Sequence, residues 1–145
     1  MIIMSVDLGK TRTGLALCDK DETISFPICT IIEKNPERLA EKIKEIIIEK
    51  NVELLVLGLP KNMNGTLGES AQNAINFKNM MESITDIKVV LWDERRTTIS
   101  AHNYLNEINV RGKKRKSIID TLSASIILEN YLNYRKSTKD FHNSI

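Results

Sequence analysis

The sequence predicts an α/β fold with a mixed, five-stranded sheet flanked by helices. The first third of the chain contains three short β-rich runs separated by turns, and helical and strand patterns then alternate. A block of consecutive strands followed by such alternation favours antiparallel pairing among the first three strands and parallel pairing among the later ones. A length of 145 residues fits one compact domain. We expect this domain to span residues 1–135 and a flexible polar tail to follow at 136–145.

The first three strands are predicted by short apolar runs that end at turn residues. Ile2–Asp7 is apolar and ends in a carboxylate just before Gly9, which is typical of a buried strand followed by a tight turn. A second strand is expected from Gly14 to Cys18. The third, Ile24–Ile32, contains Pro27, so we place it at or near a sheet edge.

The remaining elements follow from hydrophobic periodicity. Pro36 opens a segment with apolar residues at a helical spacing, and Asn35 is placed to cap it. Leu54–Leu59 is a continuous apolar run, which is typical of a strand buried on both faces. The elements expected after it are a helix at Glu69–Ile84, a strand at Ile87–Trp92, and helices at Thr98–Ile108 and Ser117–Tyr134.

Composition excludes several classes of protein. Hydrophobic residues make up 41% and charged residues 28% of the chain, as in ordinary globular domains. The apolar runs are far shorter than the roughly 20 residues that span a bilayer, so we expect no membrane association. No basic leader precedes Ser5, and we expect a cytoplasmic location in which both cysteines remain thiols. The net charge of +2 means that attraction to nucleic acid requires local clusters of basic residues.

Three acidic positions stand where a site is expected. Asp7 closes the first strand and Glu94, with Asp93 beside it, follows the last one, while Asp120 lies near the start of the final predicted helix. Ligands of α/β sheets collect beyond the carboxyl ends of parallel strands. Carboxylates brought together there repel one another unless a hard cation such as Mg²⁺ or Mn²⁺ lies between them. Metal ions held in this way activate water for phosphodiester hydrolysis in many nucleases.

Each acid also has an ordinary structural interpretation. Asp7 fits a turn, Asp120 fits a helix cap, and Asp93 or Glu94 fits a surface pair with the arginines that follow. The metal-site hypothesis therefore depends on the acids occurring together.

Four motifs in order resemble the YqgF family of Holliday junction resolvases. They are Val6–Ala16, Gly58–Thr66, Asp93–Thr98 and Asp120–Ala124. The resemblance spans Val6 to about Leu128. It implies a ribonuclease H-like fold, a divalent-metal nuclease, a role in processing the 5′ end of pre-16S ribosomal RNA, and a catalytic and metal-binding set of Asp7, Glu94 and Asp120.

The chain departs from the usual family pattern at three positions. Asn64 stands where the family often has an acid, which removes a charge but keeps a turn-forming residue. Arg96 replaces a usual Leu and Ser125 replaces a common Ala. None of these departures removes a member of the expected acidic set.

Basic and polar residues around the acids are candidates for binding nucleic acid. Five of the six residues in the Arg111–Lys116 segment are basic, and we expect a loop there that contacts phosphates next to the site. The segment after Gly58 offers small hydrogen-bond donors but lacks the ending of a Walker loop. The alternatives are a solvated loop and a plain connector. The full candidate set is Lys10, Arg12, Asn62, Asn64, Thr66, Arg95, Arg111, Lys113, Lys114, Arg115 and Lys116.

We therefore expect a metal-dependent endonuclease acting on pre-rRNA or branched DNA, as a monomer or a homodimer. One alternative is a non-catalytic RNA-binding factor in ribosome assembly. Another is a phosphate-binding lobe like those of actin-like ATPases, suggested by the Asp7–Thr11 segment. Those ATPases hold ATP between two lobes, and this length supplies one.

Overall fold

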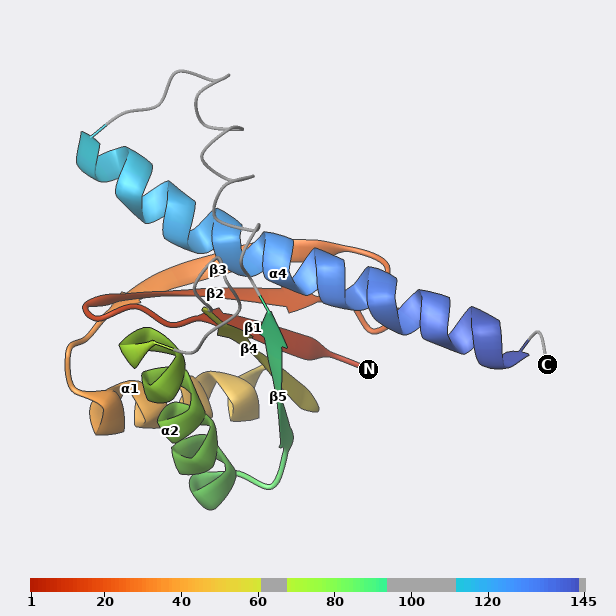
Figure 1. The fold of residues 1–145 in the computed structure, drawn as a ribbon, viewed down its shortest axis with the longest axis horizontal. Coiled ribbons are helices and arrows are strands. Elements are labelled where there is room, and N and C mark those ends of the chain that lie inside the picture. The colour runs from red at the N-terminus through yellow and green to blue at the C-terminus, as the bar shows by residue number, and fades with distance from the viewer. Residues whose placement is uncertain (61–67, 94–111, 144–145) are drawn as a thin grey trace.

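A computed structural model describes the backbone of residues 1–60, 68–93 and 112–143, and the side chains of residues 1–60, 68–93 and 122–138. Its strands and helices lie in a layered arrangement (Figure 1). In chain order they are β1 (Ile3–Asp7), β2 (Arg12–Cys18), β3 (Ser25–Ile32), α1 (Pro36–Glu49), β4 (Leu54–Leu59), α2 (Glu69–Ile84), β5 (Lys88–Asp93) and α4 (Gly112–Asn143). The helix predicted at Thr98–Ile108 lies outside the described residues.

The five strands form one mixed sheet in the order β3-β2-β1-β4-β5. β1 pairs antiparallel with β2, and β2 pairs antiparallel with β3. β4 lies parallel to both β1 and β5. The predicted fold class and strand directions are confirmed, and β3 lies at the edge where Pro27 placed it. Because β1, β4 and β5 are parallel, their carboxyl ends reach the same edge of the sheet.

α1 begins where the sequence predicts it. Pro36 occupies the first turn, and the Asn35 side chain accepts a hydrogen bond from the Arg38 amide at 3.0 Å. This cap satisfies one of the amides that have no partner within the helix. Leu39, Ile43 and Ile47 lie on one side of the helix and are buried.

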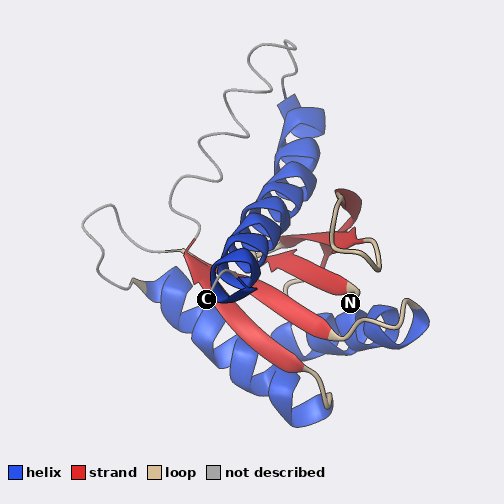
Figure 2. Cartoon of the chain, turned by 90° about the vertical axis from the view of Figure 1, so that its right-hand side faces the viewer, coloured by secondary structure: helices blue, strands red, loops and turns tan. Residues whose placement is uncertain are grey.

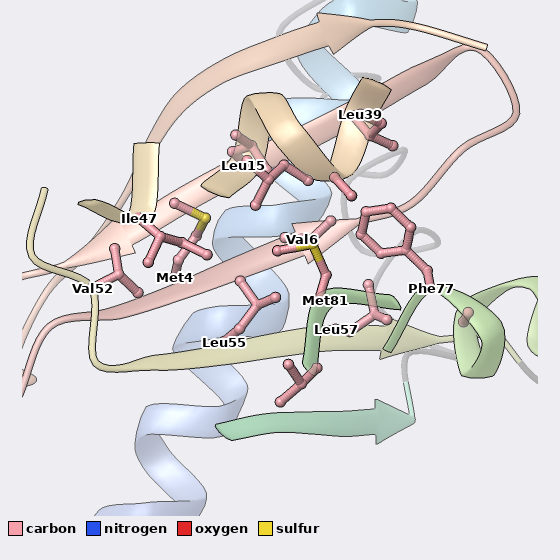
Figure 3. Close-up of a cluster of buried hydrophobic side chains, with 14 of the residues drawn as sticks. Met4, Val6, Leu15, Leu39, Ile47, Val52, Leu55, Leu57, Phe77 and Met81 are labelled. Carbon is pink, nitrogen blue, oxygen red and sulfur yellow. The ribbon is translucent and has the colours of Figure 1, made fainter. Parts of the chain in front are cut away.

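Helices cover both faces of the sheet. α1 and α2 lie on one side and α4 lies on the other (Figure 2). Side chains from α1, α2 and one face of the sheet form the larger core, much of which is drawn in Figure 3. Its buried members include Met4, Val6, Leu15, Leu39, Ile43, Leu55, Leu57, Phe77 and Met81. The second core joins α4 to the opposite face through Ile3, Ala16, Val56, Ala124, Ile127 and Leu128.

α4 is longer at both ends than the predicted helix Ser117–Tyr134. It begins at Gly112, so the basic residues Lys113–Lys116 lie in its first turns and not in a loop. The prediction took this basic segment as a loop before the helix, although Lys and Arg are good helix formers. The helix also continues to Asn143, which makes most of the expected tail helical.

The described helices include none that is both long enough and apolar enough to cross a bilayer.

Candidate functional site

Asp7 lies at the carboxyl end of β1 and on the face of the sheet that α4 covers. Successive side chains of a strand point to opposite faces. Met4 and Val6 belong to the core beneath α1 and α2, whereas Ile3 packs with α4. Ser5 donates a hydrogen bond from its hydroxyl to the Ala124 carbonyl of α4. Asp7, two residues beyond Ser5, therefore shares the α4 face, and its side chain is partly buried.

β1 and α4 run in opposite directions across this face (Figure 1). Two residues of strand advance the chain by about 6.6 Å, and four residues of helix advance it by about 6 Å. From the contact between Ser5 and Ala124, the step forward to Asp7 and the step back to Asp120 therefore lead toward the same edge of the sheet. The structure brings the backbone positions of Asp7 and Asp120 to one face, and the side chain of Asp120 lies outside its described part.

Asp120 lies more than two turns inside α4, eight residues after Gly112. The prediction that it stands near the start of a helix is therefore wrong, and so is the alternative that it caps one. The prediction placed the start at Ser117, directly before the first apolar residues, and did not anticipate that the basic segment is helical.

Of the two acids at the end of β5, Asp93 belongs to the described residues and Glu94 does not. Asp93 is the last residue of β5, whereas the predicted strand ends one residue earlier. Val90 and Trp92 pack with the α4 side of the sheet, and Leu91 packs with the α1 and α2 side. The alternation of the strand places Asp93 on the side of Leu91, opposite Asp7. Glu94 lies outside the described residues.

Two polar contacts hold α4 against β3 and the β2–β3 turn. The Ser25 hydroxyl of β3 donates to the Ser125 carbonyl at 3.0 Å. Farther along the helix, Arg135 Nε lies 2.7 Å from Glu22 Oε1, and the Met1 amine lies 3.0 Å from Glu22 Oε2. Burial raises the pKa of Glu22, but the hydrogen bonds from Arg135 and the Met1 amine outweigh it and leave that pKa below its usual value. These contacts define where α4 lies over β1.

The turn between β1 and β2 requires glycine at position 9, two residues after Asp7. A Cβ on Gly9 would lie 2.1 Å from the Arg12 carbonyl oxygen, far inside contact distance. The chain therefore folds back tightly. Lys10 is exposed and Arg12 is partly exposed, so both cations stand at the sheet edge that Asp7 reaches. This tight turn is consistent with the prediction that Lys10 and Arg12 lie near Asp7.

The other predicted nucleic-acid contacts are described only in part. The backbone of Lys113, Lys114, Arg115 and Lys116 lies in the first turns of α4, which also carries Asp120. Outside the described residues lie Asn62, Asn64, Thr66, Arg95 and Arg111.

Ser123 is a buried polar residue close to Asp120 in the chain, and the sequence analysis assigned it no role. It is 1% exposed, and its Oγ has no hydrogen-bond partner among the residues that the structure describes. The position lies three residues after Asp120 and beside Ala124, on the part of α4 nearest the sheet. A buried hydroxyl without a partner indicates a place where a further polar group fits. The sequence signal was its spacing from Asp120, but the spacing alone does not reveal that the hydroxyl is unpaired.

The residues at this edge fit a hard divalent cation by their chemistry. Asp7 supplies carboxylate oxygens, the ligands that Mg²⁺ and Mn²⁺ prefer, and the unpaired Ser123 hydroxyl is a polar group of the same face. Within residues 1–60, 68–93 and 122–138, no three acidic, His or Cys side chains form a metal-binding group. Two of the three predicted ligands, Glu94 and Asp120, have side chains outside those ranges.

A pocket lies on the opposite side of the sheet, between α1, α2 and the β1–β2 turn. Its volume is about 640 Å³. Lys10, Glu33, Lys34, Asn73 and Phe77 are among its lining residues. The sequence analysis did not predict it, because it depends on how two helices pack against one turn.

Comparison with solved structures defines the class of the fold. The RuvC structure of Thermus thermophilus matches with a TM-score of 0.59 and 12% sequence identity over 95% of this chain and 98% of that one. The fowlpox virus Holliday junction resolvase matches with a TM-score of 0.57 and 15% identity over 92% and 99% of the two chains. The chain therefore has the ribonuclease H-like fold of the RuvC-type resolvases, as the resemblance implied.

Sequence comparison then gives the family. The family model described as "RuvX: Holliday junction resolvase" matches residues 1–134, and the chain belongs to this family. A relative from Thermoanaerobacter pseudethanolicus is 41% identical over 138 residues, which cover 94% of this chain and 99% of the relative. One from Halothermothrix orenii is 42% identical over 135 residues, or 93% and 96% of the two chains. Both are named "Putative pre-16S rRNA nuclease".

Proposed function

We propose that this protein is a divalent-metal-dependent endonuclease that hydrolyses a phosphodiester bond in structured nucleic acid, with pre-16S ribosomal RNA as its main substrate. Membership of a resolvase family and relatives named for pre-16S rRNA support the reaction and the substrate. The observation that carries the proposal is the position of Asp7 at the end of β1, on the face that α4 crosses in the opposite direction.

Asp7, Glu94 and Asp120 are the proposed ligands of Mg²⁺ or Mn²⁺. A divalent cation held there supplies activation of the attacking water and stabilisation of the leaving oxygen. The role of the protein is to orient the carboxylates. The tight turn at Gly9 and the contact between Ser5 and Ala124 serve that purpose.

The proposed substrate contacts surround this edge. Lys10 lies in the β1–β2 turn, Arg12 is the first residue of β2, and Lys113–Lys116 lie in the first turns of α4, the helix that carries Asp120. Contacts of this kind hold phosphates without reading sequence. Such phosphate contacts are suited to a nucleic acid that is recognised by its shape and not by its sequence.

Cleavage assays with a matched pair of acid variants test the proposal. The wild type, Asp7→Asn and Asp86→Asn are incubated with Mg²⁺ or Mn²⁺ and either a pre-16S rRNA fragment or a four-way DNA junction. Asp86 is an exposed acid just before β5, at the opposite edge of the sheet, so its variant controls for loss of one negative charge. We expect metal-dependent cleavage that Asp7→Asn abolishes and Asp86→Asn preserves. Equal cleavage by all three proteins would refute the site, and binding without cleavage in either metal would favour the non-catalytic alternative.

The same two substrates also test whether the protein acts as a monomer or as a homodimer. Paired cuts in a four-way junction require two sites related by a two-fold axis, so we propose that junction cleavage is carried out by a homodimer and that one cut in rRNA needs a single copy. Sedimentation of the protein with each substrate distinguishes the two. A role in rRNA maturation places the protein in the cytoplasm.

A further inference from the structure

The pocket between α1, α2 and the β1–β2 turn is a cavity to which the acidic site assigns no role. Its volume is about 640 Å³, and pockets that hold small molecules and cofactors have volumes of about 300–1,000 Å³. Residues 8–10 form one wall, residues 33–39 form a second, and α2 forms the third. All of these segments belong to the described part of the chain.

Hydrogen bonds hold two of these walls together. The Glu33 amide donates to the Thr11 carbonyl oxygen at 2.8 Å, which ties the segment before α1 to the β1–β2 turn. Lys42 Nζ of α1 lies 3.1 Å from Glu33 Oε1, and this contact lowers the pKa of Glu33. The pocket is therefore formed by contacts within the protein and does not need a ligand to shape it.

The lining offers both apolar surface and hydrogen-bonding groups. Leu8 and Met80 are partly exposed, so a ligand in the pocket contacts carbon surface. Ser70 and Asn73 are exposed on the α2 wall, and neither side chain makes a hydrogen bond within the described part of the chain. An amide side chain both donates and accepts hydrogen bonds, as the edges of nucleobases do. A flat ring with polar edges therefore fits this lining.

The charges of the lining favour an anionic group beside such a ring. Lys10 and Lys34 are exposed, and neither forms an ion pair with a described residue. Of the two acids in the lining, Glu33 is neutralised by Lys42, so the two lysines stand against Glu69 alone. Lysine is a common phosphate-binding residue. A ring that carries a phosphate, as a nucleotide does, matches both the apolar and the charged parts of the pocket.

A single turn links the pocket to the acid of the proposed site. Asp7 lies on the α4 face, whereas Leu8, the next residue, packs with the core beneath α1 and α2 and lines the pocket. Consecutive Cα atoms are 3.8 Å apart, so the acid and the pocket lie on either side of one strand end. Lys10, in the turn that follows, lines the pocket and stands at the same sheet edge as Asp7. A nucleic-acid strand that crosses this turn can therefore reach both places.

We propose that the pocket holds one unpaired nucleotide of the nucleic-acid substrate, close to the bond that the acidic site cleaves. This inference rests on the proposed function. The base lies against Leu8 and Met80, its polar edge bonds to Asn73, and its phosphate is held by Lys10 or Lys34. An unpaired base enters such a pocket at the least cost, because a paired base must first leave its stack. The pocket thereby selects RNA that has an unpaired residue beside the cleaved bond, and such residues are the parts of RNA that proteins ordinarily read.

Binding of RNA to the full chain in EDTA, where metal-dependent cleavage cannot occur, tests the inference. One probe is a fully paired duplex, and the other is the same duplex with one additional, unpaired fluorescent adenine analogue that brightens when it leaves the base stack. We expect the wild type to bind the bulged duplex more tightly than the paired one and to raise its fluorescence. Equal affinity for the two duplexes would overturn the proposal.

Variants on the α2 wall locate the binding in the pocket. Asn73→Ala should weaken binding of the bulged duplex about fivefold, which corresponds to the loss of one hydrogen bond. Ser70→Trp places a large ring in the pocket and should abolish the preference for the bulged duplex. Asn79→Ala and Ser83→Trp are the matched controls, because both positions are exposed on α2 and neither lines the pocket. Both controls should bind like the wild type, and an unchanged Tm checks that each variant is folded.

The outcomes also distinguish this inference from the proposed function. If Asp7→Asn abolishes cleavage but Asn73→Ala and Ser70→Trp bind the bulged duplex like their controls, the pocket is refuted and the nuclease site stands. If Ser70→Trp loses binding of adenosine monophosphate but not of the bulged duplex, the occupant is a free nucleotide and the proposal is equally overturned. If the wild type cleaves neither substrate in either metal but still prefers the bulged duplex through the pocket, the nuclease is refuted and the nucleotide site stands.

Discussion

Replacement of Gly9 by alanine should damage both the fold and the site, because the turn after Asp7 has no room for a side chain. The added Cβ would lie 2.1 Å from the Arg12 carbonyl oxygen. An ordinary carbon–oxygen contact is about 3.3 Å, so the turn must open by about 1 Å. The obstacle is a backbone atom of the first residue of β2, which cannot rotate away as a flexible side chain would.

The size of the effect follows from this overlap. Overpacking of this kind costs roughly 1–3 kcal/mol, and for a domain of this length 2 kcal/mol lowers Tm by about 4–8 °C. Opening the turn also shifts the end of β1. A misplacement of about 1 Å at a catalytic group reduces activity by about 100-fold.

Thermal unfolding and cleavage rate, measured on the same preparation, check both parts. Lys20→Ala, an exposed substitution in the turn between β2 and β3, is the control and should retain the wild-type Tm. A Gly9→Ala protein with wild-type Tm and wild-type cleavage would show that the turn tolerates a Cβ. The argument that this turn fixes Asp7 would then be refuted.

Three other substitutions test separate parts of the account. Ile127→Ala, in the core beneath α4, should lower the free energy of unfolding by about 2–5 kcal/mol in urea titrations. Glu22→Gln should lower it by about 1 kcal/mol at pH 7. Because the pKa of Glu22 is lowered in the folded protein, its contribution is complete above the ordinary value of 4.5 and is lost as the pH falls through the lowered pKa, so the two proteins should converge in acid. Joint replacement of Lys113, Lys114 and Arg115 by alanine should weaken nucleic-acid binding and flatten its salt dependence, as measured by fluorescence anisotropy at several salt concentrations.

Much of the fold could be predicted because local signals agree with the tertiary structure. Asn35 and Pro36 predict the first turn of α1, and the structure confirms both the helix and its cap. Pro27 predicts an edge strand, and β3 lies at the edge of the sheet. The continuous apolar run of Leu54–Leu59 predicts a strand buried on both faces, and β4 contributes side chains to both cores.

The ends of α4 could not be predicted from hydrophobic periodicity. Residues 113–116 are basic and residues 135–140 are polar, so neither segment shows an apolar side. They are nevertheless helical, and neither segment contains proline. After Tyr134, a contact with the rest of the protein also supports the helix. Arg135, paired with Glu22 beyond the end of the predicted helix, is one such contact.

The candidate site was predictable in part. The position of Asp7 followed from the rule that ligands collect at the carboxyl ends of parallel strands. The face occupied by Asp93 follows from which neighbouring side chains pack against α4, and a strand that is apolar on both faces does not show this in its sequence.

The central claim is that Asp7 belongs to a site for divalent cations, and anomalous diffraction from a crystal soaked in Mn²⁺ tests it most directly. The account predicts a manganese peak about 2–2.5 Å from an Asp7 carboxylate oxygen, with Glu94 and Asp120 completing the ligand set. Manganese bound elsewhere on the molecule, with none at Asp7, would contradict it.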